Sequence, residues 1–448
     1  MSNIVNIICT GKKNCKKCSV CAETMRHNNI QVQTTGIKSR DMLSDLYDSG
    51  GYGIAVDIGT TTVAMYLYSL GTGGLIDYAG IENPQRVYGA DVISRINYII
   101  ENDGLRAMQS LILNCVADLT DTLCKRNGIT QADIYSAVFA GNTVMQSIAA
   151  GINPKDIAFA PFTPPDLFDY EIPADILPSG LAQGAKIYLA PAFAGYVGGD
   201  VATGIIAADM DLSDKIKLYL DIGTNGEIGL GNRDGIIFCA TAAGPAFEGA
   251  HIECGTPGIP GAINKVERAH DGGISYETIG GLPPVGICGS GIIDACAAML
   301  DLGVLDETGL IDVGRDDNND SEFKIVDGIY ICQKDIREIQ LAKSAVSAGI
   351  ATLLHYSNKT LDDIDEVILA GGFGSHINKK SACKIGLIPL ELEDKITIAG
   401  NAAGMGASAV LLNRQARERI KKLGAISSYT ELSGDDFFMD EYIEHMMF

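Results

Sequence analysis

Gly53-Ile-Ala-Val-Asp-Ile-Gly-Thr-Thr-Thr-Val-Ala-Met-Tyr-Leu-Tyr68 decides the fold, because the tetrapeptide at its centre occurs a second time in the chain. Asp57-Ile-Gly-Thr60 and Asp221-Ile-Gly-Thr224 each end a short apolar run and lead into another one. Two apolar runs joined by a glycine turn predict a pair of strands connected by a tight loop. Because the flanking runs agree as well as the turns, an internal repeat is favoured over two coincidentally similar hairpins.

The residue types in the two turns suit an anionic ligand. Gly59 and Gly223 lack a Cβ atom, so an anion can approach the backbone closely. Phosphate oxygens can accept from backbone N–H groups and from the hydroxyls of Thr60, Thr61, Thr62 and Thr224, and Asn225-Gly226 extends the second loop. Asp57 and Asp221 would repel phosphate, so we expect them to hold, through water, a Mg²⁺ ion that bridges the phosphates.

Further segments supply more candidate site residues. Glu366 to Ser375 predicts a buried strand that enters a glycine turn at Gly371, Gly372 and Gly374. Gly400-Asn401 opens a helix of small residues that runs towards Leu412. Glu248 is positioned to orient the water that attacks a γ-phosphate, and Asn142 to position water or phosphate. Taken alone, Glu248 and Asn142 are more often capping or turn residues.

The order of these segments resembles the phosphate-1, phosphate-2, adenosine and connect-2 motifs of the actin, hexokinase and heat-shock chaperone superfamily. Pro191 to Gly204 is similar to the connect-1 helix of that superfamily. The resemblance implies an α/β fold of two RNase-H-like lobes with ATP in the cleft between them. It implies a first lobe at residues 51–205, completed by a helix near 400–412, a second lobe at 206–400 and a C-terminal extension at 413–448.

Four longer segments make the resemblance narrower: Glu82 to Ile96, Ala140 to Met145, Ala243 to Gly255, and Gly286 to Asp294. They are similar to the reductive activators of corrinoid proteins. In that family ATP hydrolysis supports the one-electron reduction of inactive Co(II) corrinoid to methyl-accepting Co(I). The resemblance therefore implies an ATP-hydrolysing reductive activase whose partner is the corrinoid protein of a methyltransferase system.

The first 30 residues carry a different signal, a compact C-x5-C-x2-C-x2-C cluster formed by Cys9, Cys15, Cys18 and Cys21. Overlapping C-x2-C spacing predicts an iron–sulfur cluster, with 4Fe–4S favoured over 2Fe–2S. Zinc ranks second because its structural sites usually pair two separated knuckles, and four unligated thiols rank third. Residues 31–50 are expected to be a linker.

The net charge of the chain changes sign near residue 40. Lys and Arg number 34 against 56 Asp and Glu, a net charge of −22 at pH 7. Residues 1–40 hold seven basic residues against Glu23 alone, a net +6 that leaves −28 for the rest. An acidic body disfavours nucleic-acid binding, whereas the basic head suits an acidic electron donor such as a ferredoxin. With no signal peptide and no run of 18 apolar residues, a cytoplasmic protein without a membrane span is expected.

Residues 1–40, the basic and Cys-rich head, differ from the pattern of that family. Familiar activators carry a full N-terminal 2Fe–2S ferredoxin-like domain, and the residues ahead of the first loop are too few for one. One alternative is that electrons arrive from a separate protein. Two other functions stay open: an ATPase that donates electrons to a radical dehydratase, and a nucleotide-switched chaperone with a structural zinc head. A homodimer also stays open.

Overall fold

The first half of the chain forms a six-stranded mixed sheet in a computed structural model that describes residues 50–178, 180–269, 272–312, 322–374 and 376–448. The strand order is β3-β2-β1-β4-β6-β5, with β4 parallel to β1 and β6 parallel to β4. The strands are β1 (Tyr52–Ile58), β2 (Thr62–Ser69), β3 (Leu75–Glu82), β4 (Ile134–Gly141), β5 (Tyr170–Pro173) and β6 (Lys186–Leu189).

Helices cover both faces of this sheet, which is why β1 and β2 are apolar along nearly their whole length rather than alternating. One face packs on α2 (Val92–Asn102), α3 (Leu105–Asn127) and α4 (Thr143–Ala150) around a core that includes Ile54, Met65 and Phe139. The other face packs on α5 (Gly199–Ala207) and α10 (Ala402–Leu412). The buried residues of α3 recur at helical spacing, so this helix is amphipathic.

The second half builds another six-stranded sheet in the order β16-β15-β7-β8-β9-β17. Its strands are β7 (Lys217–Ile222), β8 (Gly226–Asn232), β9 (Gly235–Thr241), β15 (Glu366–Ala370), β16 (Ile396–Gly400) and β17 (Ser427–Tyr429). In both sheets an antiparallel meander of three strands is extended by two strands parallel to the first of them. The internal repeat predicted from the duplicated tetrapeptide is therefore present.

Smaller elements complete the second half. A three-stranded sheet has the order β11-β10-β12, and β13 pairs with β14 in a hairpin. These strands are β10 (Ala262–Arg268), β11 (Ile274–Thr278), β12 (Gly286–Ile287), β13 (Glu322–Val326) and β14 (Ile329–Cys332). The helices are α6 (Gly289–Leu302), α7 (Gln333–Ser357), α8 (Gly371–Gly374), α9 (Lys379–Lys384), α11 (Arg414–Ile426) and α12 (Asp436–Glu444).

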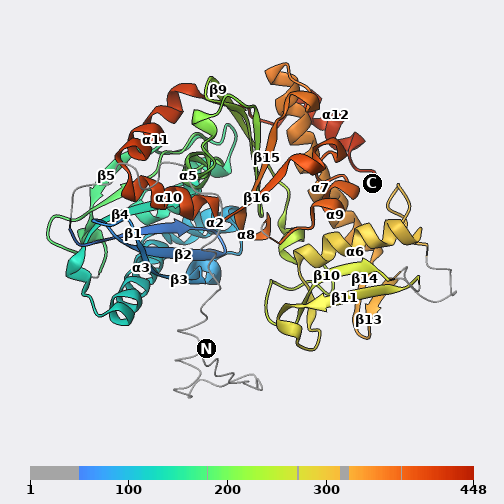
Figure 1. The fold of residues 1–448 in the computed structure, drawn as a ribbon, viewed down its shortest axis with the longest axis horizontal. Helices are drawn as coiled ribbons and strands as arrows, with labels where there is room; N and C mark the ends of the chain where they lie inside the picture. Colours follow the sequence, from blue (N-terminus) through green and yellow to red (C-terminus); the bar gives the residue numbers. More distant parts are fainter. Residues whose placement is uncertain (1–49, 179, 270–271, 313–321, 375) are drawn as a thin grey trace.

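Two helices cross between the sheets and join them. Although α10 follows β16 of the second sheet, it packs against α5 and against β1 and β4 of the first (Figure 1). A Cβ atom on Gly406 of α10 would lie 1.7 Å from the carbonyl oxygen of Thr203 in α5, so only glycine fits at the crossing. A Cβ on Gly204 would likewise meet the Tyr219 hydroxyl of β7 at 2.0 Å.

The end of the chain is held by the second half. The helix α12 packs on α7, and β17 joins the second sheet beside β9. Lys343 of α7 is 1% exposed, and its Nζ donates to the carbonyl of His445 at 2.7 Å and to that of Met447. Gln340 donates to the Met446 carbonyl at 2.6 Å. The last residues are thus bound through their main chain, and Phe438, Tyr442 and Phe448 also pack against the core of the second half.

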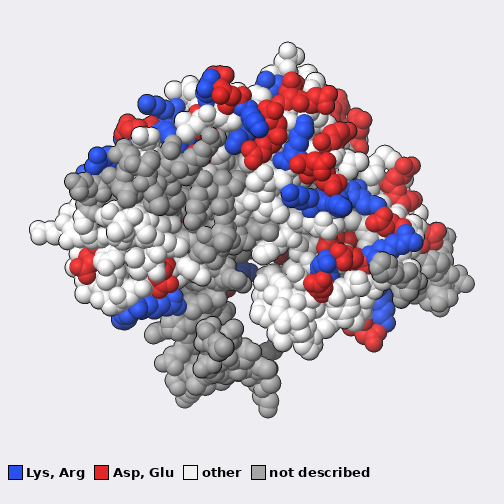
Figure 2. Space-filling model, viewed as in Figure 1, with Lys and Arg blue, Asp and Glu red and all other residues white. Residues whose placement is uncertain are grey.

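Figure 2 shows acidic and basic side chains interspersed over the described part of one face. Among the described residues, no helix combines the length and the apolar composition that crossing a bilayer requires.

Candidate functional site in the cleft between the sheets

The first loop of the site is the turn between β1 and β2. The Gly59 N–H donates to the Thr62 carbonyl at 2.9 Å, and a Cβ on Gly59 would lie only 2.7 Å from that oxygen. The turn itself therefore requires this glycine. Thr60, Thr61 and Thr62 follow, and the exposed Thr61 forms the tip.

Two buried polar residues that sequence reasoning missed hold the loop from behind. Asn83 is fully buried, and its side-chain amide donates to the Gly59 carbonyl at 2.8 Å while its N–H donates to the Thr61 carbonyl at 2.8 Å. Arg95, also fully buried, donates to the Thr60 carbonyl at 2.6 Å. Three successive carbonyls of the loop are thus engaged on its inner side.

Asn142 connects this loop to β4. Its Oδ1 accepts from the Met145 N–H at 2.9 Å and so caps the N-terminus of α4. Its Nδ2 donates to the Thr60 hydroxyl at 2.9 Å. Asn142 therefore caps a helix, which is the structural role that the sequence analysis named, and also contacts the first glycine loop.

The second loop, between β7 and β8, is one residue shorter than the first. Ile58 pairs with Val63 across the first turn, whereas Ile222 pairs with Gly226 across the second. The Gly223 N–H donates to the Asn225 carbonyl at 2.9 Å. A Cβ on Gly223 would meet nothing closer than 3.7 Å, so this glycine leaves space beside the loop rather than filling a steric need.

Glu248 lies against the second loop, at the end of a 3-10 helix (Pro245–Glu248). Its carboxylate accepts hydrogen bonds from the N–H and the hydroxyl of Thr224. Burial nevertheless raises the pKa of Glu248 above its usual range, although these hydrogen bonds and the charge of Arg86 oppose the shift. The structure thus brings Glu248 to donors that the sequence analysis expected to hold phosphate.

Four carboxylates lie near enough to raise one another's pKa: Asp57, Asp200, Asp221 and Glu227. Asp57 and Asp221 are the second-last residues of β1 and β7, close to the strand ends that the sequence analysis expected, but Asp200 at the start of α5 and Glu227 of β8 were missed. Glu227 pairs directly with Asp221 across the hairpin. Counting paired residues outward from the turn would have identified Glu227, because it lies opposite Asp221 on the next strand.

Burial and mutual repulsion keep these groups protonated to unusually high pH. Burial first, and then the charge of Asp200, raises the pKa of Asp57 to about 7, although a hydrogen bond from Asn401 at 2.9 Å lowers it. Burial, Asp200 and Asp57 raise the pKa of Asp221 to about 7. Burial likewise raises the pKa of Asp200 to about 6, and that of Glu227 lies well above its usual value. A bound cation would relieve this repulsion.

The site lacks a ready-made metal cage. In the described ranges, no three His, Cys, Asp or Glu side chains converge to ligate a metal ion together. The carboxylates nevertheless fit Mg²⁺, because that ion keeps several waters and is held by one or two carboxylates and by substrate phosphates.

The predicted adenosine side adjoins the same carboxylates. After β15 the chain turns at Gly371, where φ is +85° and a Cβ would lie 2.3 Å from Asp221 Oδ1. Gly372 is exposed with nothing within 4 Å of a Cβ, whereas Gly374 packs on Leu369. The three glycines therefore differ: Gly371 allows the turn, Gly372 leaves open space and Gly374 packs in the core.

Asn401 joins the two halves of the site. Its Nδ2 donates to Asp57, and its Oδ1 accepts from the Gly404 N–H at 2.7 Å at the start of α10. It follows Gly400, which ends β16 with φ at +68°. A residue at the end of the second sheet thus fixes the carboxylate of the first.

The predicted metal ligands Cys9, Cys15, Cys18 and Cys21 lie outside the described residues. The eight cysteines within the described residues carry free thiols. Cys115 and Cys124 are buried in the core, where burial raises the pKa of both thiols.

The chain contains two sheets of similar strand order, and in each a glycine loop joins the first two strands of the meander. Together with the carboxylates between the loops, this arrangement defines the actin-like class of ATPases. Two family models match almost the whole described chain: the RACo middle region over residues 52–213, and the C-terminal domain of RACo, the ASKHA domain, over residues 215–448. This chain belongs to the RACo family.

Individual relatives agree with that assignment. The corrinoid activation enzyme RamQ of Eubacterium limosum is 35% identical over 424 residues, which are 89% of this chain and 70% of RamQ. The Co(II) methylated amine-specific corrinoid protein reductase of Methanosarcina barkeri is 24% identical over 393 residues, 81% of this chain and 70% of its own length. A solved reductive activator for corrinoid, iron–sulfur protein superposes with a TM-score of 0.79 at 39% identity, covering 90% of this chain and 66% of that one.

Proposed function

We propose that this protein is an ATP-dependent reductive activator of a corrinoid protein. One electron passes to the Co(II) corrinoid of the partner and yields Co(I), and ATP hydrolysis in the cleft supports this uphill step. The observation that carries the proposal is the pair of glycine loops around four carboxylates, within a chain that matches RACo over residues 52–213 and 215–448. The names of the relatives favour this function over the radical dehydratase and chaperone alternatives.

In this proposal the two loops hold the phosphates of ATP. The N–H groups and hydroxyls of Thr60 to Thr62 donate to one phosphate, and Thr224 with Asn225 and Gly226 donate to another. Asp57 and Asp221 would hold Mg²⁺ through water, and the ion would offset the charge of the phosphates. The open side of Gly372 leaves room for the adenosine.

Glu248 has a proposed role that follows from its present contacts. Phosphate and the Glu248 carboxylate need the same Thr224 donors, so a bound phosphate displaces the carboxylate. The freed carboxylate, whose pKa is raised by burial, can then accept a proton from the attacking water. Glu248→Gln would keep the size of the side chain and remove the base.

The iron–sulfur cluster is proposed from the sequence alone. Cys9, Cys15, Cys18 and Cys21 supply four thiolates, and a cluster bound there provides one-electron chemistry. A ferredoxin-type protein is the proposed electron donor. Iron and acid-labile sulfide in anaerobically purified protein test this assignment, and zinc alone at one per chain would remove its support.

The decisive experiment is anaerobic incubation with Co(II) corrinoid protein, reductant and ATP, with Co(I) followed by its absorbance. We expect Co(I) to form with Mg-ATP and to be lost without ATP, after chelation of Mg²⁺, or in Asp57→Asn. Tyr356→Phe is a control outside the site, because it removes the hydroxyl of a half-exposed side chain on α7 whose hydrogen-bond partner among the described residues is Asp435. Reduction that proceeds equally well without ATP would exclude the mechanism.

A further inference from the structure

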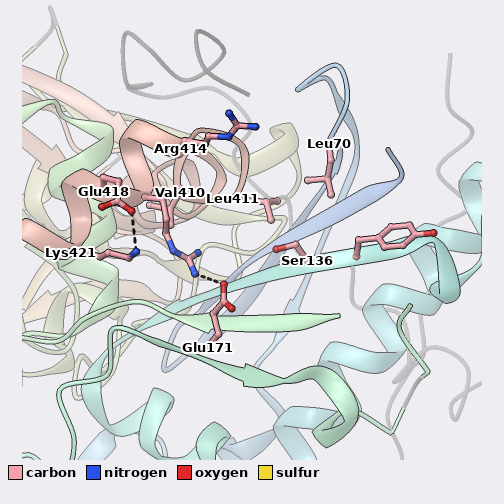
Figure 3. A pocket seen from close by; sticks show the side chains of 10 residues that line it. Leu70, Ser136, Glu171, Val410, Leu411, Arg414, Glu418 and Lys421 are labelled. Atoms are coloured by element: carbon pink, nitrogen blue, oxygen red, sulfur yellow. Dashed lines mark hydrogen bonds and ion pairs between the residues drawn. The ribbon is translucent and has the colours of Figure 1, made fainter. Parts of the chain in front are cut away.

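A groove lies on the first lobe, at the end of the sheet away from the glycine loops. Its volume is about 410 Å³, and it opens between α11 and the start of β4 (Figure 3). Buried Leu70, Val410 and Leu411 form its floor. The rim holds Tyr135, Ser136 and Glu171 on one side and Arg414, Arg417, Glu418 and Lys421 of α11 on the other.

The rim is basic on a strongly acidic chain. The rim holds Arg414, Arg417 and Lys421 against Glu171 and Glu418, a net +1 on a chain whose net charge is −22, and Lys421 pairs with Glu418 at 3.0 Å. Arg417 lies 3.2 Å above the ring of Tyr188 and pairs with Glu171 at 3.0 Å, which fixes its guanidinium at the groove. An apolar floor with a cationic rim fits a segment that carries both acidic and bulky apolar side chains.

The chain enters the structure at the edge of this groove. Gly51 has φ of +83°, and a Cβ there would lie 2.4 Å from the ring of Tyr135. The Gly51 carbonyl accepts from the N–H of Leu70 at 3.0 Å. Gly51 thus contacts two groove residues, one on the rim and one on the floor.

The sequence just ahead of Gly50 has the matching chemistry. Asp41-Met-Leu-Ser-Asp-Leu-Tyr-Asp-Ser49 contains three aspartates, no basic residue and four bulky apolar residues. This differs sharply from residues 1–40, whose net charge is +6. Nine residues span at most about 30 Å when extended and about 14 Å as a helix, so either form can run along the groove.

We propose that residues 41–49 dock in this groove, with their aspartates towards Arg414 and Lys421 and their apolar side chains on the floor. The docking anchors the Cys-rich head to the first lobe, on the side away from the glycine loops. It concerns contacts within the chain and stands independently of the corrinoid reaction.

Hydrogen–deuterium exchange of the full chain under anaerobic conditions tests the docking. We expect the amides of residues 41–49 to be protected, and Arg414→Glu with Lys421→Glu to speed their exchange by about tenfold. Lys422→Glu is the matched control, because it makes the same charge change on the same helix outside the groove. Adding Asp41→Lys, Asp45→Lys and Asp48→Lys to the groove variant should restore protection.

Three results would overturn the proposal. The first is unchanged exchange of residues 41–49 in the groove variant while β1 and β4 stay protected, because the fold is then intact and the groove irrelevant. The second is equal acceleration by Lys422→Glu. The third is protection that disappears on dilution, since a second copy of the chain would then supply the segment.

Discussion

Binding of Mg-nucleotide should depend steeply on pH through Asp57 and Asp221. The pKa of each carboxyl is raised to about 7, and a cation binds the ionised form in competition with protons. A carboxyl of pKa about 7 is about one-tenth ionised at pH 6 and about nine-tenths ionised at pH 8. Each required carboxylate therefore contributes about a tenfold rise in affinity over that range, and the two together about a hundredfold.

Calorimetric titration with Mg-ADP at pH 6, 7 and 8 measures this rise, and buffers of different ionisation enthalpy count the protons released. Asp221→Asn should reduce the rise to about tenfold, and Asp57→Asn should reduce it to about tenfold or less, because the charge of Asp57 also raises the pKa of Asp221. Each variant should remove at least about one proton from the count at pH 6. The nucleotide's own titration is common to all three proteins and cancels in the comparison. Identical pH dependence in the wild type and both variants would refute the reasoning.

The same carboxyls give the nucleotide-free protein the opposite pH dependence of stability. Their folded pKa values lie above the unfolded value of 3.8, so the folded state binds more protons between about pH 4 and pH 7. Their contribution to the unfolding free energy therefore falls as pH rises through that window. Urea denaturation at several pH values should show this fall, and Asp221→Asn should reduce it.

Three further substitutions test the packing around the site. Asn83→Ala leaves the Gly59 carbonyl without its side-chain donor, so the free energy of unfolding in urea should fall by about 1–3 kcal/mol and nucleotide affinity should fall with it. Gly406→Val forces side-chain atoms into the α5 backbone and should cost at least about 3 kcal/mol, measured by thermal unfolding, whereas Gly424→Ala on exposed α11 should be neutral or stabilise by up to about 1 kcal/mol. Lys343→Met removes the donor to two main-chain carbonyls near the C-terminus, so the last residues should become accessible to carboxypeptidase.

The strands and loops were predictable because they depend on local sequence. Apolar runs bounded by glycine turns determine β1, β2, β7 and β8, and the repeated tetrapeptide indicates that the two hairpins are related. The loop residues and the two aspartates at the strand ends follow directly from that assignment. Sequence motifs were enough to predict these strands and loops, because each one is determined by residues within its own segment.

The residues that were missed depend on contacts between distant segments. Arg95 lies 35 positions from the Thr60 carbonyl that it binds, and Asn83 lies 24 positions from Gly59. Nothing in a single sequence distinguishes such buried polar residues from solvated ones. The role of Gly59 also differs from the expectation, because steric crowding by Thr62 requires glycine there before any anion binds.

The unequal lengths of the two glycine loops have a consequence for how a nucleotide can lie in the cleft. Four residues separate the paired ends of β1 and β2, but only three separate those of β7 and β8. Two identical loops would present the same set of donors to any two phosphates. The extra threonine makes the loops inequivalent, so we expect each to suit a different phosphate of a bound nucleotide.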